Sequence, residues 1–388
     1  MLQHLFKLIW NKKKQNFLLI IEMLISFIVM FAVFTLVVYF YQNYNRPMGF
    51  EYENVWTTRY DNPAGMSDTD SVTEFRASLK QLVKAMPQVA EVAFSNVNTP
   101  FSDATIGGGI NHGKIQARTN LYSADDAYRD VLGIQLKAGR WFSKDDMGAR
   151  EKPVVINESL KQELFGNDNP IGKTVNDHDR VVGVVSDMKD EGDFTGRKNA
   201  VFSRVDTSNQ LWGGVMLIKV KPTADADFEG RLYKALSGAI QNKSIEISHL
   251  DKLRTGKNQR LLTGVIIILI VAGFLVVNVA LGLFGVLWYN INKRKSEIGL
   301  RRAVGASGAA ISKQLIGEAM VLATLALIIG TFFAIQFPLM NVFNLATNTY
   351  LIALALAITF IYLLVIICAL YPGRQAAAIF PAVALHEE

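Results

Sequence analysis

The stretch that comes nearest to a chemical site runs from Gly166 to Thr174 (GNDNPIGKT) and approximates the spacing of a phosphate-binding loop. Such a loop has four residues between its first glycine and the Gly-Lys-Ser/Thr end, because that spacing wraps backbone N–H groups around the phosphates. Here five residues intervene, and Pro170 supplies no N–H. We therefore predict no nucleotide site. We expect a helix that ends at Phe165, then a turn, and then a strand start with Lys173 on the surface.

No other group of residues has the composition of a catalytic or metal site. The single cysteine, Cys368, excludes an intrachain disulfide and a cysteine-based zinc site. No serine lies in a G-x-S-x-G nucleophile elbow. The histidines have no metal-ligand spacing to one another; they are His4, His112, His178, His249 and His386. The sequence therefore predicts a non-catalytic protein with no catalytic residues, no metal and no cofactor.

The composition indicates a membrane protein. Half of the 388 residues are hydrophobic and 19% are charged, against about a quarter charged in soluble domains. The apolar residues form four long blocks, and the longest, 319–373, has no charged residue. Buried helices of a soluble core would have polar faces, which these blocks lack. About 20 apolar residues span a bilayer as a helix. We therefore predict transmembrane helices at 17–41, 261–291, 315–337 and 350–371, with a short outer loop at 338–349.

Charge placement predicts the orientation. Residues 1–16 carry four lysines and no acid, and residues 292–318 carry six basic residues against two acidic ones. Because cytoplasmic segments are rich in Lys and Arg, we expect the N-terminus and the 372–388 tail in the cytoplasm of a bacterial cell. The net charge of +6 then lies at the inner-membrane surface and does not indicate nucleic-acid binding. Four basic residues at the outer end of the second span, Lys252, Arg254, Lys257 and Arg260, argue weakly for the opposite orientation.

The first apolar block is interpreted as a retained anchor, because it is longer than the ~7–15 residues of a signal-peptide core. Residues 42–260 then form a large extracytoplasmic α+β domain inserted between the first and second spans. Two β-α-β units are predicted in it by their hydrophobic period. One has strands at 54–60 and 89–97, with Val72, Phe75, Leu79, Leu82, Val83 and Met86 on one helix face. The other has strands at 214–221 and 244–248, with Phe228, Leu232, Leu236 and Ile240. We expect the two units to pair in one subdomain, with residues 100–210 as an inserted β-rich subdomain.

The segment from Lys293 to Ser307 (KRKSEIGLRRAVGAS) leaves the second span as a basic helix. Gly305 suits the position after a helix end, and Ser307 suits the N-cap of a new helix that runs into the third span. The segment 292–314 is therefore predicted to be a cytoplasmic helical hairpin with small residues at its apex. One interpretation is that its charges only anchor the spans. The other is that it is a docking knob, with Arg301 and Arg302 facing acidic partners.

The motifs resemble those of the FtsX/MacB-type permeases of ABC transporters. The segment 297–306 (EIGLRRAVGA), followed by Glu318, is similar to the membrane signature of that family. The segments 139–146, 154–166, 170–173 and 180–187 resemble its extracytoplasmic domain, and 371–374 and 381–385 resemble its tail. The resemblance covers nearly the whole chain and keeps the order of the parts. It implies a MacB-like core domain in 42–260 and an FtsX-like membrane domain.

The resemblance further implies a permease that acts as a dimer with a second copy or a paralogue, and with cytoplasmic ABC ATPases. Only 16 residues precede the first span, so we expect the ATPase on a separate chain. In this family, ATP-driven motion reshapes the periplasmic domain, which is called mechanotransmission. A periplasmic adaptor and an outer-membrane channel are candidate partners. The expected ATPase-coupling residues are Glu297, Ile298, Gly299, Leu300, Arg301, Arg302, Gly305, Ala306 and Ser307.

Three polar residues stand out within or next to the spans. Glu22 is a candidate functional group because ionisable residues in membranes are costly, although it is near enough to the inner face to snorkel or to pair with Lys14. Asn278 could hydrogen-bond across helices or simply pack. Glu318 is expected to be structural, in the dimer or the hairpin. Residues 2–10 form an amphipathic stretch suited to the inner leaflet.

Two functions remain open from the sequence. The first is a transporter subunit that couples ATP hydrolysis to efflux or release of a drug, a peptide or a lipoprotein. The second is a non-transporting regulator that activates a cell-wall hydrolase or a sensor. The large extracytoplasmic domain favours the first.

Overall fold

The computed structural model describes residues 13–63, 66, 68–205, 214–240 and 245–378. The amphipathic stretch predicted at 2–10 lies outside these residues. The chain divides into two compact units, which are described separately. The helical unit consists of residues 1–42 and 262–388, and the sheet unit of residues 43–261.

Four helices within the described residues are long and apolar enough to cross a membrane, which confirms the predicted fold class. They are α2 (Lys13–Tyr44), α7 (Leu250–Lys293), α9 (Gly308–Leu339) and α10 (Thr347–Ala377). Each is longer than the predicted span. Helix α7 begins eleven residues before 261, and α10 continues through Pro372 into the predicted tail. Pro338 lies in the last turn of α9, and the chain reverses after it through a short 3-10 helix, η3 (Val342–Asn344).

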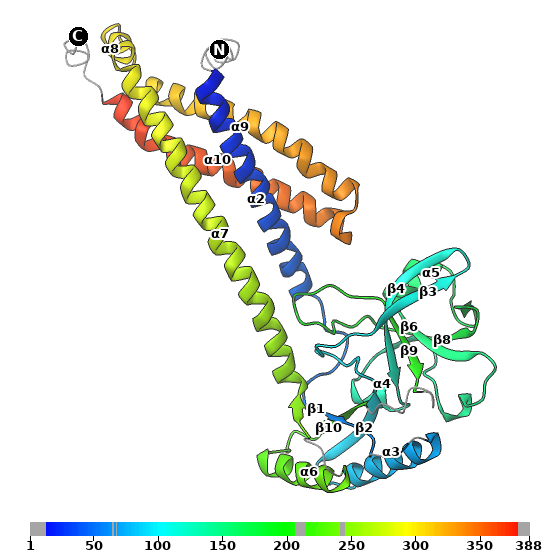
Figure 1. The fold of residues 1–388 in the computed structure, drawn as a ribbon. Coiled ribbons are helices and arrows are strands. Elements are labelled where there is room, and N and C mark those ends of the chain that lie inside the picture. Colours follow the sequence, from blue (N-terminus) through cyan, green and yellow to red (C-terminus); the bar gives the residue numbers. More distant parts are fainter. Residues whose placement is uncertain (1–12, 64–65, 67, 206–213, 241–244, 379–388) are drawn as a thin grey trace. The chain divides into compact units, whose positions relative to one another are not determined.

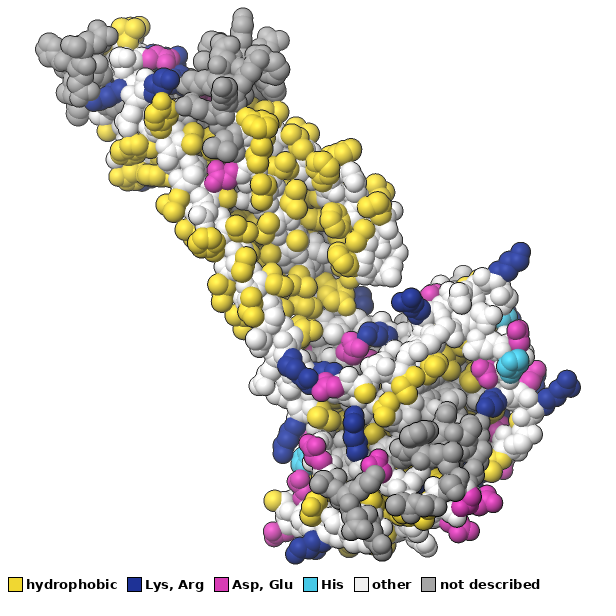
Figure 2. Space-filling view, in the orientation of Figure 1, with side chains coloured by type: hydrophobic (Ala, Val, Ile, Leu, Met, Phe, Trp, Pro, Cys, Tyr) yellow, Lys and Arg dark blue, Asp and Glu magenta, His cyan; other side chains and the backbone are white. Residues whose placement is uncertain are grey.

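The helical unit packs around small residues. Helices α9 and α10 form an antiparallel pair (Figure 1), in which Ala323, Ala326, Ala353 and Ala357 are fully buried. Small side chains let two membrane helices approach closely. Helices α2 and α7 contribute large side chains to the same core, among them Phe27 and Leu283. The outward surfaces are apolar, as Figure 2 shows for one face, and α7 is the least buried of the four. That surface suits contact with lipid.

The described residues of the sheet unit form one mixed sheet of eleven strands. The strand order is β11-β1-β10-β2-β4-β9-β6-β8-β5, with β3 paired to β4 and β7 to β8. The strands are β1 (Val55–Tyr60), β2 (Val89–Ser95), β3 (Gly107–His112), β4 (Ile115–Ala124), β5 (Leu136–Gly139), β6 (Lys152–Asn157), β7 (Thr174–Val175), β8 (Asp179–Val185), β9 (Ala200–Arg204), β10 (Gly214–Val220) and β11 (Ile247–His249).

Both predicted β-α-β units are present, and their strands interleave. Strand β10 of the second unit lies between β1 and β2 of the first, antiparallel to both. Helices α3 (Thr69–Lys84) and α6 (Ala226–Ala239) share one hydrophobic core with these strands. The helix-face prediction is wrong at Leu82, which is 39% exposed. Strand β11 begins at Ile247, later than predicted, because its pairing with β1 covers only Thr58 to Trp56.

Strands β3 to β9 lie between β2 and β10 in the chain, as predicted for an inserted β-rich part. Helix α4 (Tyr128–Val131) packs against β2 and β10, and α5 (Glu158–Phe165) packs against β4 and β6. Among the described residues, the inserted part is continuous with the rest of the sheet through a single residue pair, Ser95 on β2 and Ala124 on β4. Because the backbone ladder between the two parts is so short, side-chain contacts must stabilise their association.

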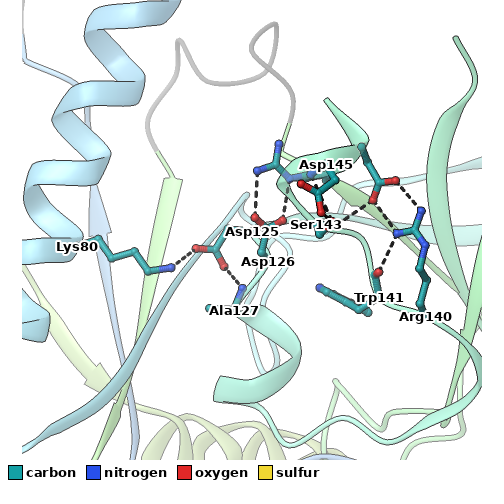
Figure 3. A network of polar contacts seen from close by, with 10 residues as sticks. Lys80, Asp125, Asp126, Ala127, Arg140, Trp141, Ser143 and Asp145 are labelled. Carbon is teal, nitrogen blue, oxygen red and sulfur yellow. Dashed lines mark hydrogen bonds and ion pairs between the residues drawn. The ribbon is translucent and has the colours of Figure 1, made fainter. Parts of the chain in front are cut away.

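Ion pairs supplement this join, as Figure 3 shows. Lys80 on α3 donates to Asp125, just after β4, at 2.9 Å. Burial raises the pKa of Asp125, and the ammonium of Lys80 opposes that rise. Next to it, Arg204 at the end of β9 forms a two-pronged pair with Asp126. The Lys80–Asp125 pair therefore connects a helix of the first part to a strand end of the inserted part.

Candidate functional site

The segment predicted to couple to an ATPase is a helical hairpin in the helical unit. Helix α7 ends at Lys293, and α8 (Lys295–Ala303) follows at once. Gly305 has φ of +104°, a left-handed conformation in which a side chain would be strained. The Ser307 hydroxyl accepts from the N–H of Ala310 and caps α9. Both cap predictions are confirmed, and together they fix the tight reversal between α8 and α9.

A five-membered polar network holds the hairpin closed. Arg294 donates to Glu297 at 2.9 Å and to Glu318 at 3.1 Å. Arg301 donates to Glu297 at 2.6 Å and to Gln314 at 2.9 Å, and Gln314 donates to Glu318 at 3.1 Å. The hydrogen bonds to Glu297 raise the pKa of Arg294. Charge-assisted bonds of this kind are roughly twice as strong as neutral ones. The network therefore stabilises one arrangement of α8 against α9.

The predicted motif divides into an inner and an outer face. Ile298 and Gly299 are buried, whereas Leu300 is 56% exposed and Val304 is 83% exposed. Ile298 packs in a small core whose other buried members are Ile291, Ile311, Leu315 and Ala376. Most of the predicted coupling residues therefore build the hairpin, and Leu300 is the large apolar side chain among them that stays exposed.

Arg302 also has an internal role. Its Nη1 donates to the carbonyl oxygen of Ala377 at the end of α10, at 2.8 Å. A Cβ on Gly308 would lie 2.7 Å from that Nη1, so the absence of a side chain there makes room for the guanidinium. The bond satisfies a carbonyl group that the helix end leaves without a helical partner. Arg301 and Arg302 therefore both have partners within the helical unit, and their role toward an acidic partner protein stays a prediction.

A shallow groove lies along the outer face of the hairpin. Its lining is mainly apolar and consists of Leu300, Arg301, Val304, Ala306, Ala310, Ile311 and Gln314. Val304, Gln314 and Arg294 were not singled out from the sequence. Val304 could have been found as an apolar residue next to a predicted helix end, and the described residues leave it 83% exposed. The two polar residues each have one partner within a helical turn, but their contacts across the hairpin, Arg294 to Glu318 and Gln314 to Arg301, join residues that are 24 and 13 positions apart and could not be found from the sequence.

The three polar residues of the spans have different surroundings. The carboxylate of Glu22 lies against Gly282 of α7, where an added Cβ would overlap its oxygens. The side chain of Lys14, its predicted partner, is outside the described part of the structure. Asn278 is exposed and donates to Phe274 of its own helix at 2.8 Å. Glu318 belongs to the hairpin network, in agreement with a structural role.

The phosphate-loop lookalike has the predicted local structure. Helix α5 ends at Phe165, and β7 starts at Thr174. Lys173 pairs with Asp168 at 2.8 Å and lies 5.5 Å from the centre of the Phe165 ring. No group of three or more His, Cys, Asp or Glu residues suited to a metal is found within the described residues.

Comparison with known families identifies the chain. The model of the MacB-like periplasmic core domain matches residues 17–231, more than half of the chain, and the model of the FtsX-like permease C-terminal region matches residues 265–381. The chain belongs to the FtsX/MacB family of ABC transporter permeases. The second match contains the whole hairpin. In this permease, the hairpin is therefore part of the family's C-terminal region, and residues 43–231 of the sheet unit fall within the match to the MacB-like periplasmic core domain.

Several curated relatives carry the name macrolide export ATP-binding/permease protein MacB. The relative from Aggregatibacter actinomycetemcomitans is 32% identical over 218 residues, covering 52% of this permease and 33% of that protein. The relative from Chlorobium phaeobacteroides is 26% identical over 335 residues, covering 80% of this permease and 48% of that protein. The permease thus spans between a third and a half of these relatives' length.

Two solved structures are also similar. One is the periplasmic region of MacB from Actinobacillus actinomycetemcomitans, with 23% identity, a TM-score of 0.39, and coverage of 55% of this chain and 97% of that one. The other is the extracellular domain of the ABC-type transporter YknZ from Gram-positive bacteria, with 14% identity, a TM-score of 0.36, and coverage of 50% of this chain and 100% of that one.

Proposed function

We propose that this protein is the permease subunit of an ABC transporter in a bacterial inner membrane. An ABC-type ATPase docks on the α8–α9 hairpin, and ATP hydrolysis drives a conformational change of the periplasmic domain. The change expels or releases a drug, a peptide or a lipoprotein. The proposal rests on family membership together with one observation: the hairpin is rigidly built, yet exposes apolar side chains at its apex.

The orientation follows from the charges. The hairpin and the N-terminal segment carry the excess of basic residues, which favours a cytoplasmic location for both by the positive-inside rule. The basic residues at the start of α7 are the exception. Three of them, Arg254, Lys257 and Arg260, form ion pairs within the sheet unit. Because these charges are already paired, they give little support to the opposite orientation.

Docking at the apex is favoured by two exposed side chains. Leu300 and Val304 lie one turn apart, and both line the groove. Burial of a fully exposed Val or Leu side chain contributes about 1.5–3 kcal/mol. The polar network behind the groove keeps the backbone in place, so a partner would not have to order the hairpin as it binds. The geometry therefore supports a preformed docking surface for a protein partner.

A charge placed in the groove tests this proposal. We expect Val304→Glu or Leu300→Glu to abolish co-purification with the cognate ATPase, because binding would bury an unpaired carboxylate. Ala309→Glu is the matched control, since Ala309 is exposed on α9 but does not line the groove. The variants should insert and fold like wild type. Wild-type ATPase binding and stimulated ATP hydrolysis by both groove variants would refute docking at this surface.

Transport is tested separately from docking. Everted membrane vesicles or lipoprotein-release assays with the reconstituted complex should show ATP-dependent movement of a cargo. A complex that hydrolyses ATP in a permease-dependent way but moves no cargo, and instead activates a cell-wall hydrolase, would favour the regulator. A second copy or a paralogue of the permease is expected in the complex, with a periplasmic adaptor and an outer-membrane channel as candidate partners.

A further inference from the structure

The first turns of α7 are fastened to two loops of the sheet unit. Arg254 pairs with Asp193 at 2.7 Å. Lys257 and Arg260 both pair with Asp103, at 2.9 and 3.0 Å. The sequence suggests that basic residues here would only flank a membrane span. In the structure they are attachment points of the helix on the periplasmic domain.

Asp193 forms the most extensive of these contacts. It belongs to the β8–β9 loop, residues 186–199, and its side chain is 9% exposed. Arg254 approaches it with two prongs, Nε at 2.8 Å and Nη2 at 2.7 Å. The Asn258 amide donates to Asp193 Oδ2 at 2.8 Å and accepts from its backbone N–H at 3.0 Å. Tyr52 completes the site, because its ring lies 4.4 Å below the guanidinium of Arg254 and its hydroxyl accepts from Nη1 at 2.6 Å.

The same loop also binds the end of α2. Lys189 is 1% exposed, and its Nζ donates to the backbone oxygen of Asn43 at 2.8 Å and to that of Asp193 at 3.0 Å. Its own N–H donates to the Met48 oxygen, just beyond the helix. Burial lowers the pKa of Lys189, and Asp193 opposes that shift. A buried ammonium is costly unless it is paired and hydrogen-bonded, so this arrangement strongly restrains the loop.

We propose that Lys189 and Asp193 are positioning residues of a latch that joins the outer ends of the first and second membrane helices to one loop of the periplasmic domain. Lys189 holds the end of α2, Asp193 holds the start of α7, and the carbonyl group of Asp193 links the two. Motion of either helix is thereby transmitted to the β8–β9 loop. The inference rests on the proposed function, in which helix motion reshapes this domain.

The loop is well placed to pass motion onward. Asp187, at its start, accepts from the Asn157 amide at 2.7 Å and from the Ser159 N–H and hydroxyl at 2.8 Å. These residues lie at the junction of β6 and α5. Displacement of the loop would therefore pull directly on the inserted β-rich part, where a single backbone pair gives the only ladder to β2 among the described residues.

The test uses the full-length permease in lipid nanodiscs. Asp193→Asn removes the charge but keeps the size, and Asp193→Glu is the conservative variant. We expect amide exchange in residues 250–258 to rise roughly 10- to 100-fold for Asp193→Asn, as loss of a charge-assisted pair allows local opening. Asp193→Glu should restore protection in part. Asp168→Asn, which breaks the exposed pair with Lys173, is the matched control and should leave this exchange unchanged.

The functional measurement is the ratio of cargo moved to ATP hydrolysed by the reconstituted complex. For Asp193→Asn and Lys189→Met, we expect ATPase binding and hydrolysis at wild-type level with a ratio lowered at least severalfold. If the two residues only stabilised the fold, ATP hydrolysis and cargo movement would fall together. Asp103→Asn serves as a second variant if the buried substitutions prevent folding, because Asp103 is exposed. We expect a smaller fall in the ratio of cargo moved to ATP hydrolysed for this variant.

The outcomes separate this inference from the proposed function. If the wild-type complex moves no cargo, the proposed function fails, and the exchange measurement still decides whether the loop fastens α7. Unchanged exchange at 250–258 in Asp193→Asn would overturn the latch. An unchanged ratio of cargo to ATP in folded Asp193→Asn and Lys189→Met would overturn its role in transmission.

Discussion

Arg294 is expected to contribute more than any other network residue to the stability of the α8–α9 hairpin. It is not among the coupling residues predicted from the sequence, yet within the described hairpin it bonds both acidic residues of the network, Glu297 and Glu318. Replacing it by methionine keeps the length of the side chain and removes the charge. We therefore predict that Arg294→Met loosens α8 and its contact with α9, while the four spans stay intact.

The size of the effect follows from the burial of the three groups. The Arg294 side chain is 13% exposed, Glu318 is 21% and Glu297 is 43% exposed. Exposed pairs contribute about 0.2–1 kcal/mol, whereas loss of one partner of a buried pair costs about 3–5 kcal/mol. Arg294 lies between these limits, and Glu318 keeps the amide of Gln314. We expect a loss of about 1–3 kcal/mol in the local stability of α8.

Hydrogen exchange on the permease alone in nanodiscs measures this quantity. A loss of that size should speed exchange of the α8 amides by about 5- to 150-fold, since 1.4 kcal/mol is tenfold. Lys313→Met is the matched control, because Lys313 is exposed on α9, and it should leave exchange unchanged. Equal exchange in the two variants would show that the network contributes nothing, and the hairpin would then have to be held by its apolar core alone.

Three further outcomes are expected. Gly183→Ala should lower the unfolding free energy by about 1–3 kcal/mol, because a Cβ there would overlap the carbonyl oxygen of Arg140. Gly230→Ala, in open space on α6, should raise the unfolding free energy by about 0.5–1 kcal/mol. Calorimetry that gives a change of the same sign for both variants would contradict this. Burial raises the pKa of Asp190, which accepts from Tyr122, so its contribution to stability is greatest at low pH and is lost as pH rises through the raised pKa. The stability of Asp190→Asn relative to wild type should therefore increase from pH 4 to pH 8, and a flat or falling difference would count against a raised pKa. Lys173→Ala should leave the thermal midpoint and cargo movement unchanged, and loss of ATP binding by the permease in this variant would revive the phosphate-loop interpretation.

Much of the fold could be predicted because it depends on patterns of residues that are close together in the sequence. The four spans follow from runs of apolar residues, since a helix in lipid needs no partner to satisfy its backbone. The strands β1, β2 and β10 and the helix faces of α3 and α6 follow from hydrophobic period. The prediction at Leu82 failed because hydrophobic period assigns a broad face of the helix to the core, whereas the packed neighbours decide which side chains of that face are buried. The ends of α7 and α10 were misplaced because polar residues continue both helices beyond the apolar run.

The sequence by itself determined the membrane spans, the family, and the reversal of the hairpin at Gly305 and Ser307. Each depends on residues that are neighbours in the chain, so composition and spacing suffice. The prediction that 166–174 is no phosphate loop also depends on residues that are neighbours in the chain, because five residues in place of four do not wrap the backbone N–H groups around a phosphate.

Only the tertiary structure decided which charges are partners. Arg294 meets Glu318 across 24 residues, Arg254 meets Asp193 across 61, and Lys189 reaches Asn43 across 146. A charged side chain in a sequence looks the same whether it faces water or a buried partner, because its energy is set by the dielectric and the ions that folding brings to it. For that reason the α8–α9 hairpin could be located from the sequence, whereas its polar network and the contacts of the β8–β9 loop could not.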